Sequence, residues 1–102
     1  MGDGKKNPET DKQKIIVYEV TVSKSALKQL EKLPADYKET IIAKIDSLAK
    51  NPRPHGCEKL SGTKNNYRIR AGMYRIVYSV FDKELVIDVV DVDHRKQVYR
   101  NL

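Results

Sequence analysis

Apolar and polar residues alternate along four stretches of this 102-residue chain, and this two-residue period predicts four β-strands. The first stretch, KIIVYEVTVS, covers residues 14–23 and is rich in Ile, Val, Tyr and Thr. Three more follow in quick succession at residues 66–71, 73–81 and 84–93. The connections between these three are short enough to join antiparallel neighbours.

Two segments between the first and second predicted strands repeat apolar residues at the helical period instead. The first, residues 24–33, has Ser23 or Ser25 available as its N-terminal cap and is ended by Pro34. Its apolar residues are Leu27, Leu30 and Leu33.

The second helical segment is PADYKETIIAKIDSLAKNP, in which Asp36 and Glu39 have the spacing of a capping box with Asp36 in the cap position. Its apolar stripe consists of Tyr37, Ile41, Ile42, Ile45, Leu48 and Ala49. Asn51 and Pro52 stop this helix, and residues 53–65, rich in Pro and Gly, are expected to form a loop. The short connection between the two helices predicts an antiparallel helical hairpin.

The predicted order is therefore β-α-α-β-β-β, which is typical of a small α+β domain with helices on one face of a twisted, mostly antiparallel sheet. We expect a single domain over residues 14–102. Residues 1–13 are polar and charged without periodicity, and we expect them to form a flexible N-terminal tail.

Three arginines stand out in the segment NNYRIRAGMYRIVYSV, residues 65–80. If Gly72 and Met73 form a two-residue turn, Arg70 lies opposite Arg75. Because side chains alternate across a strand, one face then carries Arg68, Arg70 and Arg75. The other, helix-covered face carries Ile69, Ile76 and Tyr78.

Like charges on neighbouring strands repel, so this arrangement is unfavourable unless an anion lies among the arginines. Guanidinium groups suit phosphate because their paired N–H donors match its oxygens. An alternative is that the arginines are solvated or pair with carboxylates of the last strand, namely Asp88, Asp91 or Asp93.

Overall composition agrees with an anionic partner: 20 Lys and Arg against 14 Asp and Glu give a net charge of +6. This bias favours nucleic acid, an anionic membrane surface or an acidic protein, although a solvated basic surface is the plainer explanation. Cys57 is the only cysteine and there are two histidines, so we expect no disulfide, no metal and no cofactor. With no long apolar run and no secretory signal, we expect a cytoplasmic protein without a membrane span.

The C-terminal segment adds a basic cluster that includes an aromatic residue, the composition of a stacking and phosphate-binding site for single-stranded RNA. Taken singly, Tyr99 is more often a packing residue and His94 a surface or capping residue. Grouped after the last strand, they become candidate functional residues. The cluster consists of His94, Arg95, Lys96, Tyr99 and Arg100.

Four segments in this order resemble the RelE/ParE superfamily of toxins from bacterial and archaeal toxin–antitoxin systems. They are LEKLP, the I..L..NPRP.G..KL.G pattern of residues 45–62, YRIRAGMYRIVYSV at 67–80, and V.HRKQVY at 92–99. The predicted β-α-α-β-β-β order also agrees with the family fold.

The resemblance implies an mRNA interferase of the RelE type, which cuts mRNA in the ribosomal A site without a metal. In that reaction the ribose 2′-hydroxyl attacks the adjacent phosphate, leaving a 2′,3′-cyclic phosphate and a 5′-hydroxyl. The resemblance also implies an acidic RelB-like antitoxin as partner, and we expect the free toxin to be a monomer.

Matched position by position, the family pattern implies roles for individual residues. Arg75 corresponds to the arginine that binds the scissile phosphate. Arg95 corresponds to the one that stabilises charge or protonates the leaving group, and Tyr99 to the tyrosine that stacks on the substrate. Lys96 and Arg100 are expected to contribute to RNA binding.

One departure from the family concerns Arg68 and Arg70, which stand where RelE has lysines. Arginine does not lose its proton at working pH, so both can hold phosphate but neither can act as a general base. The base is then His94, whose ordinary pKa lies near neutrality, or a ribosomal RNA group, or activation is mainly electrostatic and positional.

Two other functions fit the same sequence. ParE-like toxins share the fold but poison DNA gyrase, although they lack the full basic and aromatic set. A non-catalytic basic RNA-binding module is the second alternative, and it predicts RNA binding without cleavage.

Overall fold

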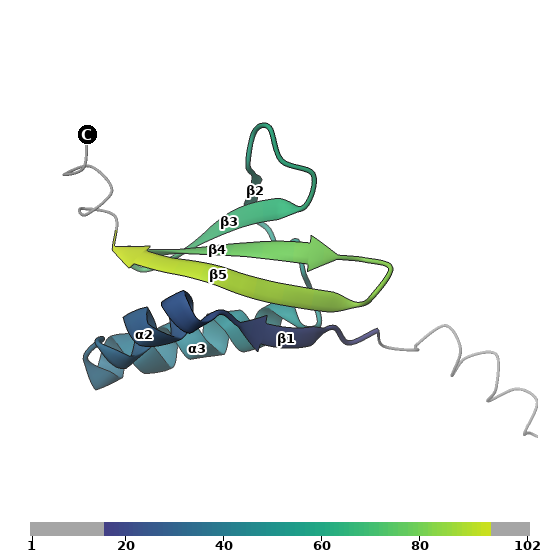
Figure 1. The fold of residues 1–102 in the computed structure, drawn as a ribbon. Helices are drawn as coiled ribbons and strands as arrows, with labels where there is room; N and C mark the ends of the chain where they lie inside the picture. Colours follow the sequence, from purple (N-terminus) through teal and green to yellow (C-terminus); the bar gives the residue numbers. More distant parts are fainter. Residues whose placement is uncertain (1–15, 95–102) are drawn as a thin grey trace, which may run out of the picture.

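Two helices and five strands make up residues 16–94, the part of the chain that the computed structural model describes (Figure 1). The tail predicted at residues 1–13 lies outside this part. In chain order the elements are β1 (Glu19–Val22), α2 (Lys24–Glu31), α3 (Ala35–Leu48), β2 (Glu58–Lys59), β3 (Asn66–Ala71), β4 (Tyr74–Phe81) and β5 (Val86–His94).

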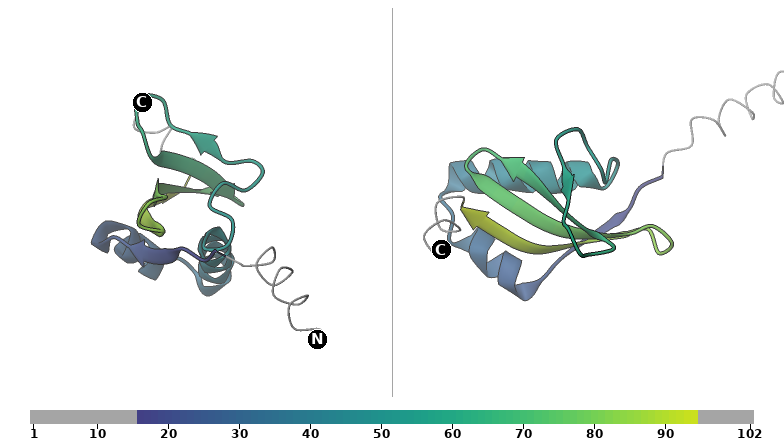
Figure 2. Two further views of the ribbon diagram at one scale, coloured as in Figure 1. Left: turned by 90° about the vertical axis from the view of Figure 1, so that its right-hand side faces the viewer. Right: turned by 90° about the horizontal axis from the view of Figure 1, so that it is seen from above.

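The strands form one sheet in the order β1-β5-β4-β3-β2, with β1 parallel to β5 and the other neighbours antiparallel. Both helices lie on the same face of this twisted sheet, as Figures 1 and 2 show from different sides. α2 packs against β5, whereas α3 packs against β1 and β3. The predicted α+β class is therefore confirmed, with β2 added to the predicted order.

The core lies between this sheet face and the helices. Its members are Ala26, Leu30, Ile41, Ile45, Leu48, Ile69, Ala71, Ile76, Tyr78, Val80, Ile87, Val89 and Val92. The predicted helical stripes contribute four residues to this core, because their side chains face the sheet: Leu30, Ile41, Ile45 and Leu48. Other members of those stripes remain exposed: Leu27, Tyr37 and Ile42.

Helix starts were predicted correctly in one case and wrongly in the other. The Ser23 hydroxyl caps α2 by accepting a hydrogen bond from the backbone N–H of Ala26 at 3.1 Å. Asp36, by contrast, is not the cap of α3. Pro34 has extended backbone and its carbonyl already accepts the N–H of Lys38, so the helix begins before Asp36 and places it in the first turn.

The first strand is shorter than predicted, because its partner β5 begins at Val86, opposite Glu19. Just before β1, the backbone N–H of Tyr18 bonds to the carbonyl of Ala49 instead of to a strand. The opposite edge of the sheet carries the strand that was not predicted. β2 has only two residues inside the expected loop, and it pairs antiparallel with β3.

Candidate active site

Arg68, Arg70 and Arg75 project from the sheet face opposite the helices, as the alternation of β3 and β4 predicts. Arg70 lies directly opposite Arg75, which confirms the predicted register. Gly72 has φ 65°, and glycine with positive φ at the first central position is typical of a type II′ hairpin turn. The turn therefore fixes the register, and the register brings the arginines together.

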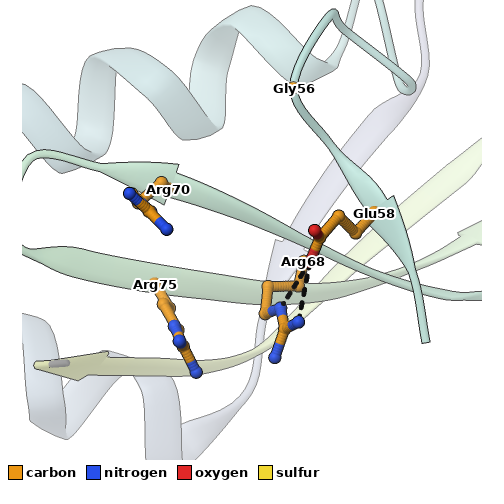
Figure 3. Close-up of a pocket in the computed structure, with 5 residues that line it drawn as sticks. All are labelled: Gly56, Glu58, Arg68, Arg70 and Arg75. Carbon is orange, nitrogen blue, oxygen red and sulfur yellow. Dashed lines mark hydrogen bonds and ion pairs between the residues drawn. The ribbon is translucent and has the colours of Figure 1, made fainter.

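These arginines surround a cavity of about 210 Å³, which we call the arginine pocket (Figure 3). Arg70 is exposed, while Arg68 and Arg75 are half-buried. The pocket is lined by Gly56, Glu58, Arg68, Arg70 and Arg75.

Glu58 brings a carboxylate into the arginine pocket from β2. It lies opposite Arg68 in the β2–β3 register, and Arg68 donates to its Oε1 from Nη2 at 2.7 Å and from Nε at 3.2 Å. The hydrogen bond and charge of Arg68, with smaller contributions from the other two arginines, hold the pKa of Glu58 below its usual value. Sequence reasoning missed this residue because a two-residue strand leaves no periodic pattern.

The arginine pocket keeps an excess of positive charge. Within residues 16–94, the ion pairs closer than 4.0 Å are Arg68–Glu58 and, elsewhere, Arg53–Asp82. Neither Arg70 nor Arg75 pairs with a carboxylate in this part of the chain. The alternative that the arginines pair with the last strand is therefore wrong for the described residues, and the pocket offers donors to an anion.

The sheet face that carries Arg68, Arg70 and Arg75, which we call the arginine face, also carries two carboxylates of β5, but these bond to α2 instead. The β4–β5 register shifts by one residue between Val77 and Tyr78, because β5 carries a β-bulge at Val90, which has no opposite residue. Beyond the bulge, Asp91 lies opposite Val77 and Asp93 opposite Arg75. The apolar residues of β5 change phase at this point, from Ile87 and Val89 to Val92, and this change is the sequence signal of the bulge.

Gln29 of α2 holds these carboxylates at the edge of β5, beyond the end of β1. Its Nε2 donates to Oδ1 of Asp91 at 2.9 Å and of Asp93 at 3.3 Å, and its Oε1 accepts the backbone N–H of Val92 at 2.8 Å. A hydrogen bond with Asp91, partial burial and the charge of Asp91 together raise the pKa of Asp93 to about 6.

The structure separates His94 from the arginines. His94 lies opposite Tyr74 in the β4–β5 register, one residue out of phase with Arg75, and its ring meets that of Tyr74 edge-on at 5.0 Å. It lines a second cavity, of about 450 Å³, with Gln29, Lys32, Leu33, Pro34, Tyr74 and Val92. Its role as acid or base stays a prediction. The other C-terminal candidates lie outside the described residues: Arg95, Lys96, Tyr99 and Arg100.

Polar contacts anchor the loop that leads into the arginine pocket. Arg53 binds both carboxylate oxygens of Asp82, at 2.7 and 3.2 Å, and lies 5.1 Å over the ring of Tyr67. The buried Tyr78 donates its hydroxyl to the carbonyl of Pro52 at 2.7 Å. The loop is thus tied to the sheet just before Gly56 and Glu58.

Comparison with known proteins identifies the family. The family described as "ParE toxin of type II toxin-antitoxin system, parDE" matches residues 20–99. This chain belongs to the RelE/ParE superfamily. It is a toxin of a type II toxin–antitoxin system, and it most resembles RelE.

Individual relatives support the RelE likeness. An Escherichia coli protein described as a RelE-like toxin is 35% identical over 78% of this chain and 85% of its own length. The mRNA interferase toxin RelE of E. coli K12 is 31% identical, over 80% of this chain and 87% of that protein. The toxin in the RelE–RelB complex of Pyrococcus horikoshii superposes with a TM-score of 0.70 at 33% identity, covering 78% of this chain and 96% of the other.

In this RelE/ParE toxin, the arginine pocket has the donors to hold a phosphate and to stabilise negative charge that develops on it. No three His, Cys, Asp or Glu side chains group as metal ligands within residues 16–94. None of the helices described is both long and apolar enough to cross a membrane.

Proposed function

We propose that this toxin is a ribosome-dependent mRNA endoribonuclease, or mRNA interferase, that cuts mRNA in the A site and so inhibits translation and growth. The observation that carries the proposal is the arginine pocket, in which Arg70 and Arg75 have no carboxylate partner among the described residues. The mRNA interferase name of the E. coli K12 relative supports it.

In the proposed reaction, a metal-independent transesterification, the 2′-oxygen forms a bond to the adjacent phosphorus and the bond from phosphorus to the 5′-oxygen breaks. Arg75 binds the scissile phosphate, and Arg68 and Arg70 add positive charge that stabilises the transition state. Following the family pattern, Arg95 assists the leaving oxygen and Tyr99 stacks on a base, while Lys96 and Arg100 bind the backbone.

The proposed partner is an acidic RelB-like antitoxin. The structural neighbours from P. horikoshii and E. coli are RelE toxins in complex with RelB, and the +6 charge of this chain suits an acidic partner. We expect the free toxin to be a monomer. Sedimentation that shows a stable homodimer without antitoxin would contradict this expectation.

ParE-like attack on DNA gyrase is the second candidate, because the family description that matches residues 20–99 is that of ParE. Primer extension on mRNA from cells that express the toxin separates the two. Cuts in phase with codons support the RNase. Intact mRNA together with gyrase-trapped, cleaved DNA would replace it with the gyrase poison.

A non-catalytic RNA-binding module predicts binding without growth arrest. If the wild type halts growth and Arg75→Ala restores it while circular dichroism shows an intact fold, this alternative fails.

A further inference from the structure

The proposed reaction needs a group that takes the proton of the 2′-hydroxyl, and the arginines of the pocket cannot supply it. A guanidinium stays protonated at any working pH, so Arg68, Arg70 and Arg75 act only as donors. Among residues 16–94, one side chain of the pocket lining can accept a proton, the carboxylate of Glu58.

We propose that Glu58 is the general base of this toxin, an inference that rests on the proposed RNase function. Arg68 places both of its hydrogen bonds on one carboxylate oxygen, Oε1. The second oxygen, Oε2, accepts no hydrogen bond from residues 16–94. Arg68 therefore orients the carboxylate while leaving Oε2 available to a hydroxyl in the pocket.

Other titratable groups near the hairpin are less well placed. Asp93 lies on the far side of Arg75 from β3, does not line the pocket, and shares Gln29 with Asp91. His94 lies against Tyr74 on the helix-covered side. The side chain of Glu58 extends from β2 toward Arg68 of β3 and lines the pocket (Figure 3).

The proton balance is simple. Glu58 Oε2 takes the 2′-hydroxyl proton as the 2′-oxygen bonds to phosphorus, and the leaving 5′-oxygen gains a proton from water. Glu58 then returns its proton to water, so no oxidant, metal or other reactant is consumed. In the free toxin the arginines lower the pKa of Glu58, which keeps it ionised. A bound phosphate adds negative charge beside it, which raises this pKa and makes the carboxylate a better base.

Glu58 could act as the general base or serve only as a counter-ion to Arg68, and the substitution Glu58→Gln separates these two roles. Glutamine keeps an oxygen that accepts from Arg68 but removes the negative charge from the pocket. Cleavage is measured in a translation reaction with purified wild-type or variant toxin. Binding is measured by fluorescence anisotropy with a 2′-O-methyl RNA oligonucleotide that cannot be cut. The matched control is Glu84→Gln, which removes an exposed carboxylate in the β4–β5 turn at the other end of the hairpin.

The proposal predicts that Glu58→Gln binds RNA at least as tightly as the wild type yet cleaves about 10² to 10⁴ times more slowly. Glu58→Asp, which restores a carboxylate, should cleave faster than Glu58→Gln. Glu84→Gln should match the wild type in both assays. If Glu58→Gln cleaves within threefold of the wild-type rate, Glu58 is not the general base, although the proposed RNase function still stands. The same conclusion follows if the variant loses RNA binding and cleavage in parallel. Absence of cleavage by the wild type would instead overturn the proposed RNase function, and Glu58 as its base with it.

Discussion

The two faces of the β3–β4 hairpin differ sharply, although the same strands build both. On the helix side, Ile69, Ile76 and Tyr78 are at most 4% exposed and belong to the core. On the other side, Arg68, Arg70 and Arg75 line an open pocket with more positive than negative charge. Because side chains alternate along a strand, placing the apolar residues on the helix side also places the arginines on the other side. A shift of one residue in the register would exchange the two faces.

The buried face of the hairpin lets a small fold carry an unfavourable cluster of like charges on the other face. Burial of Ile76 opposite Ile69 favours the same register that the Gly72 turn sets, and that register places Arg70 against Arg75. The core face therefore supplies the stability, while the arginine face is free to serve binding. Substitutions on the two faces should have separable effects.

Ile76→Ala tests the core face and should have the largest effect on stability. Ile76 is fully buried, and its truncation leaves a cavity, so we expect a loss of about 2–5 kcal/mol in the free energy of unfolding. Urea denaturation followed by circular dichroism measures it. The control Met73→Ala, at an exposed turn position, should change stability by less than about 0.5 kcal/mol. A loss below about 1 kcal/mol for Ile76→Ala would show that this face does not set the fold.

Arg75→Ala tests the arginine face and should leave the fold intact while slowing cleavage about 10²- to 10³-fold, because a donor to the developing phosphate charge is lost. Unfolding midpoints should be equal to or slightly above that of the wild type, since repulsion with Arg70 is relieved. Lys83→Ala is the control, because it removes one exposed positive charge at the far turn. An equal loss of activity in both variants would mean that net charge, not the pocket, matters.

Tyr78→Phe tests the link between the core face and the loop of the arginine pocket. The change removes the hydroxyl that donates to the Pro52 carbonyl, and we expect a loss of about 1 kcal/mol in the free energy of unfolding. Tyr37→Phe, at a half-exposed position, is the control and should have no comparable effect. Equal unfolding midpoints for the two variants would show that this hydrogen bond adds nothing to stability.

Asp93→Asn tests whether the raised pKa of Asp93, at the edge of the arginine face, makes the stability of the fold depend on pH. Because the pKa of Asp93 is raised to about 6, the folded toxin keeps a proton that the unfolded chain releases near pH 4. The contribution of Asp93 to the free energy of unfolding is therefore fully present below about pH 4 and is lost as the pH rises to about 6. We expect this loss to be roughly 1 kcal/mol after solvent screening.

The asparagine variant should therefore lose less stability than the wild type over this interval, as read from thermal midpoints at pH 4, 5, 6 and 7. Parallel curves for the wild type and the variant would contradict the raised pKa.

Much of the fold could be predicted from the sequence, because strands, turns and helix caps are marked by residues close together in the chain. The period of two in residues 66–81, with Gly72 in the turn, was enough to place Arg70 opposite Arg75. Ser23 was a recognisable helix cap. The capping prediction for Asp36 failed because Pro34 already starts the helix, which the spacing rule does not consider.

The less predictable parts of the site depend on contacts between distant segments. Glu58 reaches the arginines through a two-residue strand, and Gln29 reaches Asp91 and Asp93 across the edge of β5. Nothing local marks either contact. His94 lies on the other side of the sheet from Arg75 because side chains alternate along β5. Grouping the C-terminal residues by their proximity in sequence did not take this alternation into account.

We propose that the arginine pocket holds the scissile phosphate of ribosome-bound mRNA. The most direct test of this proposal is in vitro translation with purified toxin, followed by mapping of the cut ends and repeated with the same mRNA without ribosomes. We expect cuts in phase with codons, with 2′,3′-cyclic phosphate and 5′-hydroxyl ends, only when ribosomes are present. Full-length mRNA in the translating reaction, or equal cutting of the naked RNA, would contradict it.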